Sequence, residues 1–375
     1  MQNTDATFSW DPNNQQTFRS SGETILSGSA ETFNKMQGRG LDVYGVAQDG
    51  TQSGPLILIP DSTKSNEINW AVPASVAGNS KFQFWEKADF RILGHRKLKD
   101  ITLTDSSKHH ANYAIDFNLI DDSRVTLENL GYVYLGMSRL DTLTSPHFTG
   151  VQNSTFIILA EYIDLFYKAM ISGHSTLDVQ ANVVSTSNPA GVTSNGLQFS
   201  NNSSLLLNVR LDQNINSELK LLSSLSFHDS SHGNIYAMSI YNDVPDNNTN
   251  DFVAIDAFDN STVDIHTTQF LQENGTGKII QLSGNANVTI NPLNNIIPIS
   301  PAAELQKPTG KCWPGMINFK SGSKATLTLV GETLQNIFDV MALNDLKIVC
   351  VDGKPVDILN DLNISFKNGI VIKLK

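Results

Sequence analysis

The sequence is poor in charged residues. Asp, Glu, Lys and Arg make up only 17% of the 375 residues, against roughly 25% in ordinary soluble domains, so Asn, Ser, Thr and Gln must supply much of the polar surface. Basic residues are the scarcer kind, 26 against 37 acidic ones, and the formal net charge is −11. A nucleic-acid-binding protein needs clustered Lys and Arg to neutralise phosphate. We therefore expect no nucleic-acid partner.

Cysteines and long apolar runs are also few. Cys312 and Cys350 allow at most one disulfide, too few for a disulfide-stabilised scaffold. No stretch approaches the roughly 18 apolar residues of a membrane span, so we expect none. The first ten residues, MQNTDATFSW, lack the basic head and apolar run of a secretory signal peptide. If the protein is exported, we expect its signal to have been removed or its export to use another route.

One pattern recurs through most of the chain: two short alternating apolar and polar runs around a polar kink. The segment MINFKSGSKATLTL, residues 316–329, is a clear copy with its kink at Ser321–Ser323. Alternation turns one face of each run inward, and Asn, Asp, Gly and Ser accept the conformations that turns require. Further copies begin at Phe82, Ile115, Tyr167, Leu197, Leu225, Val253, Lys278 and Lys347.

The spacing of the copies predicts how they stack. A single copy cannot bury its apolar face alone, so successive copies must stack and pair their backbones. The kinks are 21 residues (Asn153 to His174) to 37 residues (Asn285 to Gly322) apart, too long for a meander and too irregular for a hexapeptide helix. We therefore predict an all-β fold, a right-handed parallel β-helix (solenoid) over residues 81–375 with loops that vary from coil to coil. Residues 1–80 are expected to form an irregular N-terminal cap with the first strands.

The repeat also predicts which side chains form the core. Six apolar residues of two copies should point inward: Phe199, Leu205, Leu207, Ile317, Phe319 and Leu327. Aligning KIVCVDG with MINFKSG places Cys350 at the inward position of Phe319, so we expect a buried thiol that is not paired with Cys312. A short helix is expected in the loop at Thr333–Leu343.

This pattern resembles the pectate-lyase-like right-handed parallel β-helix superfamily over Phe82 to Lys375. The Asn-, Ser- and Thr-rich, Lys-poor composition is most similar to bacterial surface adhesins, autotransporter passengers and phage tailspikes. Polygalacturonase-type members carry an Asn-Thr-Asp segment, an Asp-Asp pair, a Gly-His-Gly and an Arg-Ile-Lys. Here Asp121-Asp122 and Gly173-His174-Ser175 match two of these only in part, and no Arg-Ile-Lys exists, so the resemblance implies no catalytic residue.

One cluster has residue types suited to proton transfer: His228, Asp229 and His232, with Asp256 and Asp259 expected one coil further along. A histidine beside a carboxylate can act as an acid or base near neutral pH. Sugar hydrolysis commonly uses two carboxylates about 5–10 Å apart, or one to two coil spacings. The alternative, which we favour, is a structural ladder in which Asn202, His232 and Asn260 satisfy amides at the kink.

One loop has residue types suited to a hard cation. Oxygen ligands at near-alternate positions suit Ca²⁺, but the spacing is not that of an EF-hand, and a solvated acidic loop is the favoured alternative. The residues are Asp243, Asp246, Asn248, Asn250 and Asp251. We expect no other cofactor.

Together these features favour a non-enzymatic extracellular binding or adhesion β-solenoid, of bacterial origin, secreted or at the cell surface. Its expected partners are a host-cell or glycan surface, or other copies of itself. Two alternatives remain open. One is a carbohydrate-active β-helix enzyme, a polysaccharide lyase or glycoside hydrolase, and the other is a phage or virion structural protein. An enzyme should concentrate carboxylates, histidines and basic residues in one groove, whereas an adhesin should spread its contacts over many repeats.

Overall fold

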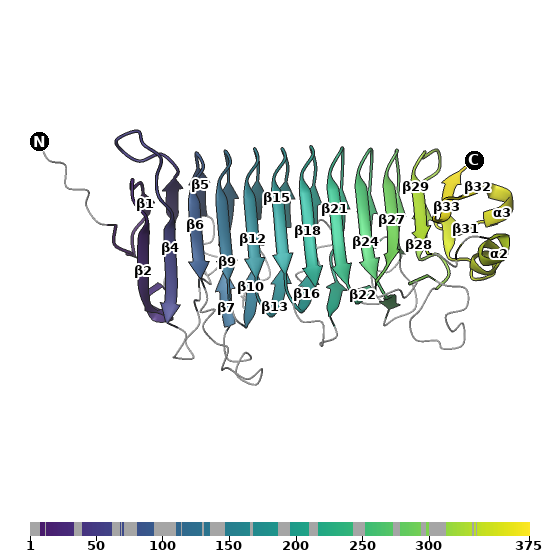
Figure 1. Cartoon of the computed structure of the whole chain (residues 1–375), viewed down its shortest axis with the longest axis horizontal. Coiled ribbons are helices and arrows are strands. Elements are labelled where there is room, and N and C mark those ends of the chain that lie inside the picture. The colour runs from purple at the N-terminus through teal and green to yellow at the C-terminus, as the bar shows by residue number, and fades with distance from the viewer. Residues whose placement is uncertain are drawn as a thin grey trace, which may run out of the picture. The chain divides into compact units, whose positions relative to one another are not determined.

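The structure, a computed structural model, describes residues 8–11, 13–33, 40–61, 68, 70, 81–93, 110–113, 115–129, 131–135, 147–165, 168–186, 196–209, 217–242, 252–272, 278–293, 298–299, 313–331, 334 and 336–375. The chain forms two compact units, Met1–Ala181 (unit 1) and Asn182–Lys375 (unit 2). Within each unit the strands lie side by side in sheets (Figure 1). Nearly all of their pairings are parallel. No helix among these residues is long and apolar enough to cross a membrane.

In unit 1 the chain passes in turn through three sheets, which we name by their place relative to the kink. The pre-turn sheet holds β1 (Gln16–Phe18), β3 (Leu41–Tyr44), β5 (Lys81–Trp85), β8 (Asp116–Leu119), β11 (His147–Gly150) and β14 (Lys168–Ile171). The post-turn sheet holds β2 (Thr24–Ser29), β4 (Leu56–Asp61), β6 (Asp89–Leu93), β9 (Arg124–Glu128), β12 (Thr155–Leu159) and β15 (Thr176–Gln180). The third sheet holds β7 (His110–Tyr113), β10 (Tyr132–Leu135) and β13 (Tyr162–Leu165). A short helix, α1 (Ala30–Phe33), follows β2.

Unit 2 repeats the same plan. Its pre-turn sheet holds β17 (Leu197–Phe199), β20 (Leu225–Phe227), β23 (Val253–Ala257), β26 (Lys278–Leu282), β28 (Ile317–Phe319), β30 (Val349–Val351) and β31 (Lys354–Pro355). Its post-turn sheet holds β18 (Ser204–Val209), β21 (His232–Ala237), β24 (Thr262–Thr267), β27 (Asn287–Pro292), β29 (Thr326–Val330), β33 (Gly369–Leu374) and β32 (Leu362–Phe366). Its third sheet holds β16 (Val183–Thr186), β19 (Glu218–Leu221), β22 (Ser239–Asn242) and β25 (Gln269–Gln272).

The fold is therefore all-β with long parallel sheets, and it is compatible with a β-solenoid. Equivalent residues of successive repeats pair directly, as in the row Leu225, Ile255, Ile280, Ile317 and Val349. The two runs around each kink were expected from the sequence. The third strand was not, because its four residues are too short to show an alternating pattern.

Left-handed turns join the pre-turn and post-turn strands. Their backbone φ angles are positive, as at Asp121 and Asp122 (52° and 59°) and at Asn201 and Asn202 (49° and 63°). Asn, Asp and Gly tolerate this conformation best, which explains the composition of the kinks. From β5 to β29, the residue that follows the turn is a buried Ser or Ala, because the tight corner leaves little room for a side chain. These residues are Ala88, Ser123, Ser154 and Ser175 in unit 1, and Ser203, Ser231, Ser261, Ala286 and Ser323 in unit 2.

The predicted inward positions are confirmed. All six residues expected in the core are buried: Phe199, Leu205, Leu207, Ile317, Phe319 and Leu327. Inward aromatic rings stack from repeat to repeat, with 6.4 Å between the ring centroids of Phe84 and Phe117 in unit 1. The corresponding distance is 5.1 Å between Phe199 and Phe227 in unit 2.

The prediction for Cys350 is confirmed in outcome, but the alignment behind it was wrong. Cys350 is a buried free thiol, and burial raises its pKa. However, Cys350 pairs with Asn318, and it is Val351 that pairs with Phe319. The apolar run IVCV (Ile348–Val351) has no polar residue to mark its phase, so the sequence could not separate the two registers. Cys312 lies outside the described residues.

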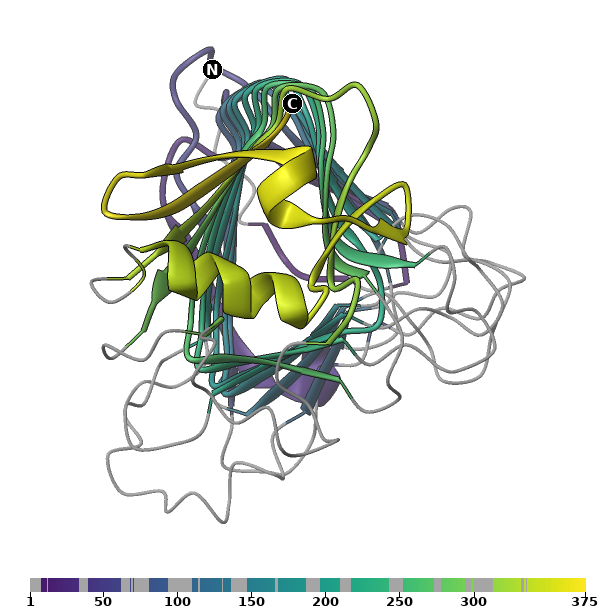
Figure 2. The ribbon, with the colours of Figure 1, turned by 90° about the vertical axis from the view of Figure 1, so that its right-hand side faces the viewer.

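At the end of unit 2, two helices and two antiparallel hairpins lie across the stack (Figure 2). Helix α2 (Ile337–Asp345) begins four residues after the start of the expected helix, Thr333–Leu343, and ends two residues after its end. Asn336 caps it by accepting bonds from the amides of Phe338 and Asp339, and Asp339 bonds back to the Asn336 amide. Helix α3 (Ile358–Asp361) follows the β30–β31 hairpin.

The core assignment predicts a stability difference between two phenylalanines of unit 2. Phe319→Ala should lower the free energy of unfolding by about 3–5 kcal/mol because it leaves a cavity in a packed core. The control, Phe338→Ala, changes a ring that is 74% exposed on α2 and should cost about 0.5 kcal/mol or less. Urea unfolding followed by circular dichroism measures both. Equal losses would contradict the assignment of Phe319 to the core.

Candidate functional site

The turns of unit 2 stack Asp229 and Asp259 at equivalent positions, with φ angles of 54° and 53°. The backbone amide of Asn201 donates to Asp229 Oδ2 at 3.3 Å, and the amide of Asp229 donates to Asp259 Oδ2 at 3.3 Å. Each carboxylate therefore accepts a hydrogen bond from the turn before it. This geometry favours the ladder interpretation for both aspartates over a role in proton transfer.

The two histidines do not join that ladder. His232 is exposed at the start of β21, where it pairs with Ser204 and Thr262. We expected it in the kink beside Asn202, and this was wrong because HDSSHGN contains two possible turns and the chain uses Asp229-Ser230. The ring of His228 stacks on Phe258, with 4.5 Å between centroids and 6° between planes, so one face of the imidazole is covered.

Asp256 lies before the turn, as the fourth of the five residues of β23, on the outward side of the pre-turn sheet. Its two carboxylate oxygens accept from Gln281 Nε2 at 3.1 and 3.2 Å. Gln281 Oε1 accepts from Asn318 Nδ2 at 2.9 Å, and Asn318 Oδ1 accepts from the amide of Gly353 at 2.8 Å. These bonds form one directed chain that ends on the carboxylate, and such chains strengthen their members cooperatively.

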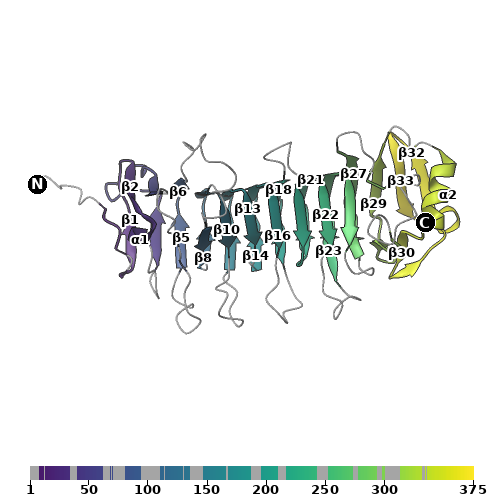
Figure 3. The same cartoon turned by 90° about the horizontal axis from the view of Figure 1, so that it is seen from below.

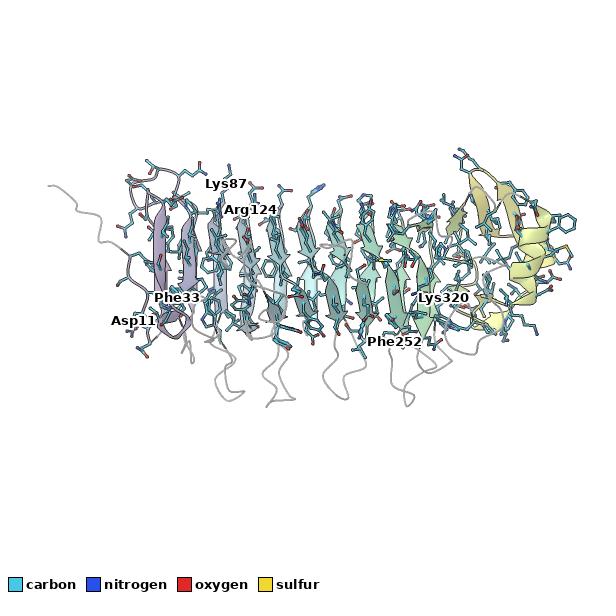
Figure 4. All side chains as sticks on the ribbon, turned by 60° about the horizontal axis from the view of Figure 1, so that its bottom comes forward. Asp11, Phe33, Lys87, Arg124, Phe252 and Lys320 are labelled. Carbon is cyan, nitrogen blue, oxygen red and sulfur yellow. The ribbon has the colours of Figure 1, made fainter. Side chains whose placement is uncertain are left out.

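Burial makes the carboxyl group of Asp256 a weaker acid than an ordinary aspartate. It raises the pKa of the carboxyl group from 3.8 to about 6, although the Gln281 hydrogen bond and the charges of Lys320 and Lys278 act in the opposite direction. Figure 4 labels Lys320 on the same unit. A carboxyl group of this kind can exchange a proton near neutral pH. Of the proposed catalytic residues, it is the one whose surroundings suit acid–base chemistry.

The alternating pattern of the strands indicates this row of outward polar residues. In β23, β26 and β28 the polar residue between two apolar ones faces outward, and these residues pair in order as Asp256, Gln281 and Asn318. Unit 1 has the same order of residue types in Asp42, Gln83 and Asn118. There Gln83 Nε2 donates to Asp42 Oδ1 at 3.0 Å, and Gln15 Nε2 donates to Asp42 Oδ2 at 3.1 Å. The repetition indicates that the Asp–Gln contact is a general way of satisfying outward polar groups.

Outward aromatic residues cluster on the third sheet of unit 1. Strands β10 and β13 lie side by side (Figure 3) and carry Tyr132, Tyr134 and Tyr162. The Tyr132 ring centroid lies 5.0 Å from that of Tyr162 and 6.4 Å from that of Tyr134. All three rings are half-buried, and Asp164 pairs with Tyr134 beside them. Flat phenol rings next to a carboxylate form an amphipathic surface.

Unit 2 carries similar groups on two different sheets. On the post-turn sheet, Tyr236 stacks on His266 with 4.2 Å between centroids, and burial lowers the pKa of His266. On the third sheet, the Lys220 ammonium lies 5.8 Å from the Tyr241 ring centroid. Half-buried aromatic groups therefore occur on outward faces in both units rather than in one groove.

The calcium prediction is not decided by the geometry. Asp243, Asp246, Asn248, Asn250 and Asp251 lie outside the described residues. Within the described segments, no group of three His, Cys, Asp or Glu side chains is placed to hold a metal ion.

Comparisons with known proteins found no matching family model, no matching curated protein and no matching solved structure. The fold and the side-chain geometry are therefore what a functional proposal has to rest on.

The environment of Asp256 predicts a pH dependence of stability. Because its pKa is raised in the folded state, its contribution is fully present below pH 3.8 and is lost as the pH rises through about 6. Relative to wild type, Asp256→Asn should gain up to about 2–3 kcal/mol of stability between pH 4 and pH 7, at roughly 1.4 kcal/mol per pKa unit. Urea unfolding at both pH values measures this difference. Parallel pH curves for the two proteins would contradict the assigned environment.

Proposed function

We propose that this chain is a right-handed parallel β-solenoid of the pectate-lyase-like kind and that it acts outside the cell as a binding or adhesion protein. The support for the solenoid is the in-register pairing of equivalent strands within each unit and the passage of the chain through three sheets per repeat. A repeated scaffold of this type offers broad outward faces on which binding groups can recur.

The observation that carries the proposal is the placement of the outward aromatic residues. Tyr132, Tyr134 and Tyr162 cluster on one sheet of unit 1, while Tyr236 and Tyr241 lie on two sheets of unit 2. Aromatic rings stack on the C–H faces of sugar rings and bury area at little entropic cost. Several weak contacts on one chain add up through effective concentration. The recurrence of outward aromatic residues in both units suits attachment to a glycan-bearing surface.

The turn aspartates support the same choice. Asp229 and Asp259 use their carboxylate oxygens to hold neighbouring turns, which leaves them less free to serve a substrate. Asp256 supports the second candidate, a carbohydrate-active enzyme, because a carboxyl group with a pKa of about 6 is suited to general acid catalysis. We place this candidate second because the hydrogen bonds of Asp256 run to a row of amides that unit 1 partly repeats.

A binding assay on immobilised bacterial and host polysaccharides, with intact host cells in parallel, tests the proposal. We expect retention of the chain on at least one surface. The double variant Tyr132→Ala, Tyr162→Ala should bind about 2–10-fold more weakly, since an aromatic contact contributes roughly 0.5–1.5 kcal/mol. Phe366→Ala, which removes an exposed ring from β32, is the matched control and should bind like wild type.

The same polysaccharides distinguish the two candidates. Under the adhesion proposal no new reducing ends or unsaturated products appear, and His232→Ala and Asp256→Asn leave binding unchanged. Turnover that is lost in Asp256→Asn would replace the proposal by the enzyme. Failure to bind any surface would reject adhesion to glycans.

A further inference from the structure

A cavity of about 320 Å³ lies at the turn edge of unit 1. It is formed where the loop between β3 and β4 folds against two successive turns. Its lining residues are Gly45, Val46 and Gln52 from the loop and Glu86, Lys87, Asp121 and Asp122 from the turns. Figure 4 labels Lys87 at this edge of the unit. The volume is at the small end of the range of ligand sites, roughly 300–1,000 Å³.

The walls of this cavity are held by backbone hydrogen bonds. The amide of Gly45 donates to the Trp85 carbonyl at 2.8 Å, and the amide of Lys87 donates to the Asp121 carbonyl at 2.7 Å. A β-carbon on Gly45 would lie 1.7 Å from the Glu86 carbonyl oxygen, so the loop touches the turn at a point where only glycine fits. The backbone that frames the cavity is therefore closely packed, while the side chains of Gln52, Glu86, Lys87, Asp121 and Asp122 around it are exposed.

An aromatic platform, formed by Tyr44 and Trp85, lies next to the lining residues along the chain, although its rings are not part of the lining itself. Tyr44 and Trp85 directly precede Gly45 and Glu86, and their rings stack with 6.5 Å between centroids and 15° between planes. The Arg19 guanidinium lies 4.2 Å from the Tyr44 ring centroid and 3.9 Å from the Glu86 carboxylate. Trp85 is half-buried, and its indole N–H has no hydrogen-bond acceptor in the described part of the chain.

The charges of the lining restrict the ligand. Three carboxylates belong to the lining, those of Glu86, Asp121 and Asp122, against the Lys87 ammonium of the lining and the Arg19 guanidinium beside Glu86. This excess of negative charge repels anionic sugars such as uronates. Carboxylates are strong acceptors for paired sugar hydroxyls, and the adjoining rings offer an apolar face for the C–H side of a pyranose.

We propose that this cavity, with Tyr44 and Trp85 at its side, binds one neutral pyranose unit of a glycan. The inference rests on the proposed function and supplies a defined sugar subsite for it. The carboxylates of Asp121 and Asp122 accept sugar hydroxyls, Gln52 contributes its amide, and the aromatic platform orients the ring.

Saturation-transfer NMR on the full chain tests the subsite with methyl glucoside, methyl galactoside, methyl mannoside, N-acetylglucosamine, glucuronate and putrescine. At least one neutral sugar should bind, and glucuronate should bind more weakly than that sugar. The double variant Asp121→Asn, Asp122→Asn should lower the affinity about 10-fold or more. Asn tolerates the left-handed turn conformation, so this variant should keep its fold, which circular dichroism verifies.

Asp352→Asn is the matched control, because Asp352 is an exposed turn residue with a φ of 48° in unit 2 and does not line the cavity. It should bind the sugar like wild type. Trp85→Phe should weaken binding about 3–10-fold, since it removes part of the stacking surface.

Three results would overturn the subsite: no neutral sugar binds, the Asp121→Asn, Asp122→Asn variant binds as well as wild type, or glucuronate or putrescine binds more tightly than any neutral sugar. These results are separable from those of the surface assay. If the intact chain binds surfaces and this double variant binds them equally, the subsite fails while the adhesion proposal stands. If the chain binds no surface but takes up a neutral sugar through these aspartates, the adhesion proposal fails and the subsite stands.

Discussion

Backbone pairing between successive repeats is the constraint on which the rest of each unit depends. A strand of one repeat satisfies its N–H and C=O groups on the equivalent strand of the next, as Ile255 does between Leu225 and Ile280. Since side chains alternate between the two faces of a strand, a slip of one residue would exchange the inward and outward sets. In-register pairing therefore explains both the apolar core and the outward rows of polar and aromatic residues.

Much of this arrangement could be predicted from the sequence, since it depends on patterns within a few residues. Phe319 and Leu327 are inward because each lies in an alternating run, and Asn202 adopts a left-handed conformation because its side chain tolerates one. Where a run has no alternation of apolar and polar residues, the predicted register was wrong. The run IVCV carries no polar residue to set its register, so Cys350 was placed one residue from its true partner.

The candidate sites were harder to predict because their chemistry is set by neighbours from other repeats. Nothing in the segment VAIDAF indicates that the carboxyl group of Asp256 has a pKa of about 6. The pKa is raised by burial among neighbouring repeats and is partly lowered again by the hydrogen bond from Gln281, which lies 25 residues further along the chain. The cavity of unit 1 is a stronger case, because it requires a loop after β3 to meet turns that follow β5 and β8. The turn motifs were visible in the sequence, but the fold-back of that loop was not.

The small residue after each turn has a consequence for how such a chain can change. Ser203, Ser231 and Ser261 occupy the same corner of consecutive repeats, and the backbone on either side of each has the same course. Excising the segment between two of these serines, or duplicating it, would bring one equivalent corner onto another and leave the pairing phase intact. Whole repeats can therefore be inserted or deleted at these corners while the residues of the core keep their positions.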